Sequence, residues 1–541
     1  MQDEASIQRL FPREEEIPTE YRMLTPIHQA ITLLDGELVP VKDGTRKVFS
    51  PICVQDGNGL RQLEIGSIPV GSLDEAAQAL QAAVAAYDRG RGEWPTMTVA
   101  ERIACMHDFT RRMVAQRRQI VNLIMWEIGK SLSDSEKKFD RTVSYINATI
   151  EALRDLDNSN SGFQVVEGTI GQIRRTPLGV VLCMGPYNYP LNETFATLIP
   201  ALIMGNSVVF KPPRFGVLLF YPLLEAFRAA FPKGVINTTY GKGSDVVPFL
   251  LNSGEINVLT LIGSSKVADH LKKQHPKANR LRAVLGLDAK NAAIVLPDAD
   301  LDLAVSECLL GALSFNGQRC TALKMLLVHQ SIAEPFLRKF NEALAKLKIG
   351  MPWEKGVSIT PLPELPKVEY MLECIEDAEA KGARVLNEGG GAHAGTLFYP
   401  AVVFPVKEGM KLYREEQFGP VVPVMPFEDI ETALEYVITS EHGQQVSIFG
   451  SNPDQIGRLV DPLVNQVCRV NLNSQCQRGP DVFPFTGRKD SAEGTLSVFD
   501  ALRSFSIRSM VAAKQNDTNK ALLDDIVTHN KSNFISTRFV F

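Results

Sequence analysis

Short apolar runs alternate with helical stretches between Gly179 and Asp288, and this alternation limits the possible folds more than any other feature of the chain. The expected strands cover residues 180–184, 207–210, 235–240, 258–262 and 282–285. Strands that alternate with helices are typical of parallel βαβ units, in which ligand-binding loops gather at the carboxyl ends of the strands. The pattern therefore predicts an α/β fold with a parallel sheet and a ligand site along one edge of it.

Two further regions flank this one. Residues 74–157 are rich in helical patterns: Ser72 can cap a helix over 73–86, and apolar residues recur at helical spacing from Phe139 to Ile150. After Asn291 a second α/β stretch begins, with expected strands over 292–296 and 325–328 and an expected helix over 332–347. We expect this second stretch to form a separate domain.

The bulk charge and the cysteines exclude several classes of protein. A formal net charge of -5 gives no electrostatic reason to bind nucleic acid or an anionic membrane. No run reaches the roughly 18 apolar residues that a membrane helix needs, and residues 1–16 lack the apolar core of a secretory signal. The 8 cysteines form no C-x-x-C pair and have no histidine at zinc-site spacing. We therefore expect no metal and a reducing, cytoplasmic compartment.

Loops at the ends of three expected strands carry candidate binding residues. The amide of Asn188 can donate a hydrogen bond to an oxyanion, although the same side chain can simply shape the turn. Lys211 and Arg214 can hold a phosphate or a ribose, or they can be solvated. Gly263 and Ser264 are small enough to let a pyrophosphate approach a helix N-terminus, but they do not form the G-x-G-x-x-G motif.

Cys320 is the candidate nucleophile. It lies in a polar, glycine-containing turn ahead of an apolar run, and Arg319 beside it supplies positive potential. A reactive cysteine needs a lowered thiol pKa, which nearby positive charge favours, and an accessible position. Many cysteines in polar loops are nevertheless inert.

Together these loops resemble those of the aldehyde dehydrogenase family, and they follow one another in the same order. The family motifs P-W-N-F-P, K-P-(A/S)-E, F-T-G-S, G-Q-x-C and E-E-x-F-G-P resemble residues 186–190, 211–214, 261–264, 317–320 and 415–420. The resemblance runs from about residue 30 to about residue 510. It implies a Rossmann-like cofactor-binding domain, an α/β catalytic domain and a small oligomerisation arm.

On this resemblance we expect five segments and a homo-oligomer, either a dimer or a tetramer. The five segments are the N-terminal part of the cofactor-binding domain (1–158), an oligomerisation hairpin (159–176), the Rossmann-like part (177–288), the catalytic domain (289–495) and a C-terminal oligomerisation arm and tail (496–541).

The resemblance also implies roles for the residues. Cys320 would attack an aldehyde, and the Asn188 amide with the Cys320 backbone N–H would hold the oxyanion. Glu416 would bind the ribose next to the nicotinamide and Phe418 would pack near the nicotinamide, while Lys211 would reach the adenine ribose.

Arg214 bears on the choice of cofactor. It replaces the family glutamate that favours NAD by bonding the ribose hydroxyls. A guanidinium at this place would instead attract a 2′-phosphate, so NADP is the expected cofactor.

Within the family, residues 317–324 and 476–481 look like those of the non-phosphorylating glyceraldehyde-3-phosphate dehydrogenases, which serve glycolysis. In that group Arg319, Arg478, Tyr189 and Arg141 would clamp the phosphate of a small phosphorylated aldehyde. Arg141 is the weakest member of the set, because it lies about 200° round from Phe139 on a helical wheel and can face solvent. The expected reaction is oxidation of glyceraldehyde 3-phosphate to 3-phosphoglycerate with NADP, without inorganic phosphate.

One departure concerns the general base. The family glutamate that assists hydrolysis of the thioester precedes the cysteine by 34 residues, where this chain has Gly286. Asp288, two residues on, is the only carboxylate near that place in the sequence, and it can equally be a turn residue. Asp288 is therefore a candidate catalytic residue by proximity alone.

Three alternatives stay open. The chain can be a CoA-acylating semialdehyde dehydrogenase, a branch that also lacks this glutamate. It can oxidise another acidic aldehyde such as succinate semialdehyde. It can also be a non-enzymatic relative that has lost its base, although Cys320, Asn188, Glu416 and Phe418 are all present.

Overall fold

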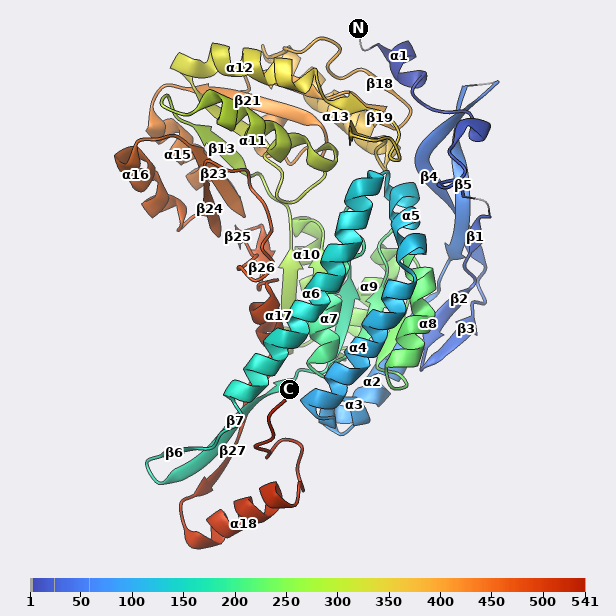
Figure 1. The fold of residues 1–541 in the computed structure, drawn as a ribbon, viewed down its shortest axis with the longest axis vertical. Coiled ribbons are helices and arrows are strands. Elements are labelled where there is room, and N and C mark those ends of the chain that lie inside the picture. The colour runs from blue at the N-terminus through green and yellow to red at the C-terminus, as the bar shows by residue number, and fades with distance from the viewer. Residues whose placement is uncertain (1–2, 24, 58, 541) are drawn as a thin grey trace.

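The computed structural model describes residues 3–23, 25–57 and 59–540, and it confirms the predicted α/β architecture. Two mostly parallel sheets lie in separate parts of the molecule, and a narrow arm projects from one end (Figure 1). Within the described residues, no helix is long and apolar enough to cross a membrane.

The first sheet has six strands in the order β10-β9-β8-β11-β12-β26. All of its pairs are parallel except the last. Because the parallel strands run the same way, the loops that follow β8, β9, β11 and β12 meet at one edge. The strands are β8 (Val180–Met184), β9 (Ser207–Lys211), β10 (Ile236–Thr238), β11 (Ile256–Ile262), β12 (Arg282–Gly286) and β26 (Ala492–Glu493).

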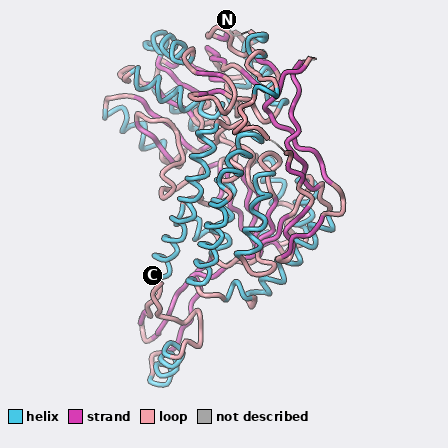
Figure 2. The backbone as a smooth tube through the Cα atoms, turned by 45° about the vertical axis from the view of Figure 1, so that its right-hand side comes forward, coloured by secondary structure: helices cyan, strands magenta, loops and turns pink. Residues whose placement is uncertain are grey.

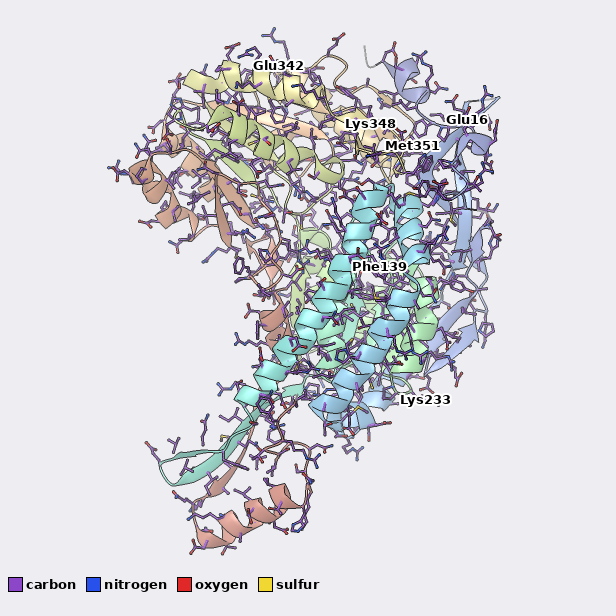
Figure 3. The ribbon with its side chains drawn as sticks, viewed as in Figure 1. Glu16, Phe139, Lys233, Glu342, Lys348 and Met351 are labelled. Atoms are coloured by element: carbon purple, nitrogen blue, oxygen red, sulfur yellow. The ribbon has the colours of Figure 1, made fainter. Side chains whose placement is uncertain are left out.

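Helices cover this sheet. Every residue of α7 is buried, and Phe139, labelled in Figure 3, lies on α6 in the same helical layer. Ser72 caps α2 as predicted, because its hydroxyl accepts a 3.3 Å hydrogen bond from the Glu75 N–H. The helices are α2 (Leu73–Tyr87), α3 (Glu93–Thr96), α4 (Val99–Ala115), α5 (Arg117–Ile128), α6 (Leu132–Ser159), α7 (Asn192–Ile203), α8 (Tyr221–Ala230), α9 (Gly243–Asn252) and α10 (Ser265–Lys272).

The second sheet has seven strands in the order β17-β20-β21-β14-β13-β23-β24. Its strands are β13 (Ala292–Val295), β14 (Met325–His329), β17 (Arg384–Val385), β20 (Ala401–Phe404), β21 (Val421–Phe427), β23 (Gln445–Phe449) and β24 (Arg469–Leu472). Its helices include α11 (Leu301–Leu313), α12 (Gln330–Leu344), α13 (Leu365–Ala380), α14 (Lys411–Arg414), α15 (Ile430–Thr439) and α16 (Pro453–Leu463). The strands expected after Asn291 are present here, and the expected helix at 332–347 begins two residues earlier and ends three earlier.

The arm is a three-stranded antiparallel sheet with one helix, and it stands clear of both parallel sheets in Figure 1 and Figure 2. It consists of β6 (Gln164–Val166), β7 (Thr169–Pro177) and β27 (Ser506–Lys514), followed by α18 (Asp517–Thr528). The chain then returns to the root of the arm, where Val540 N–H donates to Asn158 Oδ1 at 2.8 Å and Asn158 Nδ2 donates to the Val540 carbonyl at 2.9 Å. The predicted segment boundaries stay a prediction.

An antiparallel ribbon near the N-terminus was not among the predicted elements. Its strands β4 (Thr45–Asp56) and β5 (Gly59–Pro69) run beside the helical layer, with β1 (Ile27–His28) parallel to β5. The ribbon matters for the site, because it brings Arg46 into the neighbourhood of Arg214 and Lys211. Smaller elements are α1 (Glu4–Gln8), β2 (Ile31–Leu34), β3 (Glu37–Pro40), β15 (Lys348–Ile349), β16 (Val357–Ile359), β18 (His393–Ala394), β19 (Leu397–Phe398), β22 (His442–Gly443), β25 (Arg488–Lys489) and α17 (Val498–Ser504).

Glu127 fixes the loop that follows Arg214. It is fully buried at the end of α5, and its carboxylate accepts backbone hydrogen bonds from Val217 at 2.9 Å and from Leu219 at 3.3 Å. Burial raises the pKa of this carboxyl from 4.5 to about 7, although the hydrogen bonds oppose the shift.

This raised pKa makes stability depend on pH. The folded protein holds the Glu127 proton more tightly than the unfolded chain, so the stabilisation is complete below pH 4.5 and is lost as the pH rises through about 7. Relative to Glu127→Gln, which does not titrate, the wild type should lose about 2–3 kcal/mol of unfolding free energy between pH 5 and pH 8. Urea unfolding of both proteins at the two pH values measures this. The exposed control Glu376→Gln should show no such trend, and a pH-independent difference for Glu127→Gln would contradict the assignment.

Candidate active site

A cavity of about 760 Å³ lies where the loops after β8, β9, β11 and β12 meet the loop that carries Cys320. Most of the predicted site residues line it: Asn188, Arg214, Gly263, Ser264, Asp288, Cys320, Glu416 and Phe418. The others lie outside its wall: Lys211, Tyr189, Arg141, Arg319 and Arg478. The structure thus gathers residues that are more than 200 positions apart in the sequence around one space.

A strained turn presents Cys320 to this cavity. Phe315, Asn316 and Gly317 all have positive φ, at 50°, 55° and 71°. A Cβ on Gly317 would lie 2.7 Å from the Gly419 carbonyl oxygen, so only glycine fits there. The buried Asn316 side chain holds the turn, because its amide donates to the Thr360 carbonyl at 2.9 Å and its oxygen accepts from the Thr360 N–H at 3.0 Å.

The surroundings of Cys320 both raise and lower the pKa of its thiol. Burial is the largest influence and raises the pKa, whereas Lys324 and Arg319 lower it and Glu416 raises it. The prediction that Arg319 supplies positive potential holds, but desolvation outweighs it and the net shift is upward. Further positive charge near the sulfur would favour the thiolate. The ring of the expected nicotinamide cofactor would supply such a charge when it is bound.

Two side-chain amides position the cysteine loop. Asn188 Nδ2 donates to the Gln318 carbonyl at 2.8 Å, and Asn291 Nδ2 donates to the Cys320 carbonyl at 2.7 Å. The first comes from the loop after β8 and the second from the start of β13, so each sheet contributes one amide. The Asn188 amide thus lies beside the cysteine loop, which is where an oxyanion donor is needed.

Glu416 is held by contacts on two sides. Its carboxylate forms an ion pair with the fully buried Lys324 and accepts a 3.2 Å hydrogen bond from the Ala289 N–H. Lys324 also donates to the Cys320 carbonyl at 3.0 Å, so it links Glu416 to the nucleophile loop. Phe418 packs edge-on against Tyr187 across the cavity, with 6.1 Å between ring centroids.

Asp288 is bound to the start of α10. One of its carboxylate oxygens accepts from the Ser265 N–H at 2.7 Å and from the Ser265 hydroxyl at 2.8 Å. In this conformation the carboxylate accepts the hydrogen bond of the Ser265 N–H. This group lies at the helix N-terminus that we expected a pyrophosphate to approach. At Gly286, by contrast, an added Cβ would meet only ordinary contacts, the nearest being Ile262 Cγ1 at 3.5 Å.

Lys211, Arg214 and Arg46 form a group of positive charges at one end of the cavity. Burial, with Arg46 close by, lowers the pKa of Lys211 to about 8, and burial and Arg214 lower the pKa of Arg46. Among the described residues, no carboxylate pairs with any of the three side chains within ion-pair distance. Three neighbouring cations, of which only Arg46 has a carboxyl nearby in the described part of the chain, that of the buried Glu127, favour the binding of an anion with more than one charge.

A second cationic group lies near Cys320. Arg141 donates to both carboxylate oxygens of Asp481, at 2.9 and 2.6 Å, so it does not simply face solvent as its helical-wheel position allowed. The buried Arg478 contacts Asp481 at 3.4 Å and forms an ion pair with Glu193. Arg319 has no carboxylate partner among the described residues: it donates to the Gly311 carbonyl at 2.8 Å and to Gln475 Oε1 at 3.2 Å. Arg141 and Tyr189 each interact electrostatically with Cys320, so these two members of the group lie near it.

Three residues of this site escaped the sequence reasoning. Arg46 lies on a ribbon far from the motifs and carries no local signal. Lys324 lies directly before the strand expected at 325–328, so its position in the sequence did not suggest a role in the site. Glu193 had a visible signal, because it is an acidic residue five positions after Asn188 in an otherwise apolar segment.

A thiol beside an amide donor, facing a cavity at the ends of parallel strands, is the arrangement of an enzyme that acts through covalent catalysis. The chain belongs to the aldehyde dehydrogenase family, whose sequence model matches residues 54–511.

Individual relatives narrow the comparison. The chain is 34% identical to the NADP-dependent glyceraldehyde-3-phosphate dehydrogenase of Streptococcus equinus over 461 residues, which covers 83% of this chain and 92% of that protein. The crystal structure of NADP-dependent glyceraldehyde-3-phosphate dehydrogenase from Bacillus halodurans C-125 complexed with NADP is 30% identical, with a TM-score of 0.81 and coverage of 90% of this chain and 100% of that one. A third relative is the 3-sulfolactaldehyde dehydrogenase of Priestia aryabhattai, 27% identical over 443 residues, 81% of this chain and 90% of that protein.

Proposed function

We propose that this protein oxidises glyceraldehyde 3-phosphate to 3-phosphoglycerate with NADP, through a thioester on Cys320 and without inorganic phosphate. The observation that carries the proposal is the group of arginines around the nucleophile, Arg319, Arg478 and Arg141. Guanidinium groups that are withdrawn from water, fully at Arg478 and partly at Arg141 and Arg319, favour an anionic substrate, because an uncharged aldehyde gives nothing in return for their desolvation. The names of the Streptococcus and Bacillus relatives support the same reaction.

The residues at the far end of the cavity fit NADP. The unpaired cations Lys211, Arg214 and Arg46 would hold the 2′-phosphate, and Glu416 would accept hydrogen bonds from the ribose next to the nicotinamide. Phe418 would pack near the nicotinamide. When bound, the cofactor supplies the hydride acceptor and a positive charge near the thiol.

Cys320 then performs the covalent chemistry. Its thiolate attacks the aldehyde carbon, and the Asn188 amide and the Cys320 N–H stabilise the oxyanion of the thiohemiacetal. Loss of hydride turns this adduct into a thioester. Water attacks the thioester, the C–S bond breaks, and Cys320 leaves as a thiolate with release of the acid.

Hydrolysis of the thioester needs a residue that takes a proton from the attacking water. Asp288 stays a candidate, but its carboxylate is bound to Ser265 and must be released before it can act as a base. A CoA-acylating enzyme would need no such base, and another acidic aldehyde would use the same arginines. Both are outcomes of the experiments below.

We also propose that the arm joins copies of this chain into a dimer or tetramer. Its strands expose Val165, Val166 and Met510, each more than half accessible. Apolar side chains along sheet edges favour pairing with another chain. The predicted cytoplasmic location fits the eight free cysteines.

The first prediction of this proposal concerns substrate and nucleophile. Glyceraldehyde 3-phosphate should reduce NADP without inorganic phosphate or CoA, with 3-phosphoglycerate as the product. Cys320→Ser should abolish this reaction and leave NADP binding intact, because a hydroxyl is a much weaker nucleophile. NADPH absorbance, product analysis and calorimetric titration of NADP measure the three quantities. A need for CoA, or a preference for succinate semialdehyde, would identify one of the alternatives instead.

Arg214 should control the choice of cofactor. Loss of one charge-assisted contact, about 1.5–3 kcal/mol, should weaken NADP binding roughly 10- to 100-fold in Arg214→Glu and spare NAD. Steady-state KM values for both cofactors test this. Arg228→Glu, an exposed charge reversal on α8, serves as the control. An unchanged NADP-to-NAD preference in Arg214→Glu would remove this residue from the cofactor site.

Arg319 offers a clean test of the substrate anion, because removing it leaves no buried carboxylate without its partner. Arg319→Leu should lower kcat/KM for glyceraldehyde 3-phosphate about 10- to 100-fold. The value for uncharged glyceraldehyde should change little. Equal losses with both aldehydes would show that Arg319 supports the loop rather than the phosphate.

A further inference from the structure

Glu193 is a buried carboxylate in the wall of the catalytic cavity. It stands in the first turn of α7, five residues after Asn188, and lines the same space as Asn188 and Cys320. Its side chain is 9% exposed, and its partner Arg478 is 6% exposed. Asn192 Nδ2 also donates to Glu193 Oε1 at 3.4 Å. A charged acid here is costly unless it is paired and hydrogen-bonded, so a ligand that takes its partner leaves the carboxylate in a less stable state.

Besides Glu193, the cavity wall carries six carboxylates among the described residues, and three of them, Asp288, Glu415 and Glu416, are already held by neighbouring residues; the others are Glu364, Glu441 and Asp490. Glu416 pairs with Lys324 beside the cysteine carbonyl, and Asp288 accepts two hydrogen bonds from Ser265. Glu415 accepts a 2.7 Å hydrogen bond from the Tyr370 hydroxyl. The partners of these three carboxylates, Ser265, Tyr370 and Lys324, are not among the residues that we propose to bind the anion of the substrate.

The partner of Glu193 is different, because Arg478 is one of the arginines that we propose to bind the anion of the substrate. Arg478 has two acidic neighbours, Glu193 and Asp481, and Asp481 is also held by both nitrogens of Arg141. An anionic group that binds Arg478 therefore competes with Glu193 more than with Asp481. A phosphate brings more charge and more acceptor oxygens than a carboxylate, so the exchange favours the substrate.

We propose that Glu193 is the base that activates water for hydrolysis of the thioester, and that the anionic group of the substrate frees it from Arg478. This inference rests on the proposed function. In the step, the freed carboxylate takes a proton from water, the water oxygen attacks the thioester carbonyl, and the C–S bond breaks. Cys320 leaves with the electron pair as a thiolate, and the proton passes from Glu193 to solvent.

This arrangement accounts for the glycine at position 286. A base at the start of α7 would line the same cavity as Cys320, so none would be needed at the end of β12. It also ties hydrolysis to the correct substrate, because an aldehyde without an anionic group leaves Glu193 paired with Arg478.

Rapid-mixing kinetics separate the two halves of the reaction. With glyceraldehyde 3-phosphate and NADP, Glu193→Gln should keep a burst of about one NADPH per active site, while the turnover that follows should fall roughly 10²- to 10⁴-fold. Asp481→Asn is the matched control, since it removes the other carboxylate from Arg478 but not one from the cavity wall. It should alter KM and leave the ratio of turnover to burst near the wild-type value.

A second measurement tests release by the anion. Uncharged glyceraldehyde should acylate the wild type but turn over slowly, and added phosphite, a poor nucleophile, should accelerate turnover about 10-fold or more by competing for Arg478. Glu193→Gln should show no such acceleration. A third variant tests rescue: Gly286→Glu added to Glu193→Gln should restore turnover, because position 286 lines the cavity and a Cβ there meets only ordinary van der Waals contacts.

The outcomes are distinct. If the wild type forms no NADPH from glyceraldehyde 3-phosphate, the proposed function fails. If it does, and Glu193→Gln turns over normally while Asp288→Asn is slow, Asp288 is the base and the inference is overturned. A Glu193→Gln protein that loses burst and turnover together, with no rescue by Gly286→Glu, assigns Glu193 a structural role and also overturns it.

Discussion

Positive charge that is removed from water must be balanced, and the catalytic cavity depends on how this chain balances it. At Lys324 and Arg478 the chain supplies its own carboxylates, from Glu416 and Glu193. At Lys211 and Arg214 it supplies none within the part of the chain that the structure describes. Where a cation already has a carboxylate partner, an incoming anion would have to replace that partner. Where it has none, as at Lys211 and Arg214, a bound anion would itself balance the charge.

The backbone framework makes these charges meet. Parallel strands of the first sheet deliver their loops to one edge, while the second sheet delivers the cysteine loop from the opposite side. Asn188 and Asn291 join the two through hydrogen bonds to adjacent parts of that loop. Because each asparagine belongs to a different sheet, a shift of one sheet relative to the other moves Cys320 against its oxyanion donor.

Local patterns predicted much of this. The strands that end at Met184, Lys211 and Ile262 and the cap at Ser72 follow from periodicity and turn chemistry, so the sequence located the loops of the site. The pairings were not predictable in the same way. Arg46 approaches Lys211, which lies 165 positions further along the chain, and nothing local indicates that Glu193 pairs with Arg478 or that Asp288 caps α10. The upward shift of the Cys320 thiol pKa was not predicted from the sequence either, because it depends on burial more than on the neighbouring Arg319.

The arm sets the order in which the molecule can be completed during synthesis. β7 pairs with β27 along its whole length, yet 337 residues separate their first positions. At a synthesis rate of about 5–20 residues per second, β7 waits roughly 20–70 s on the ribosome before its partner strand exists. Every strand of both parallel sheets, including β26, is synthesised before β27, so the arm is the last of these three sheets to be completed. Any assembly that uses the finished arm therefore begins only after the strands of both parallel sheets have been synthesised.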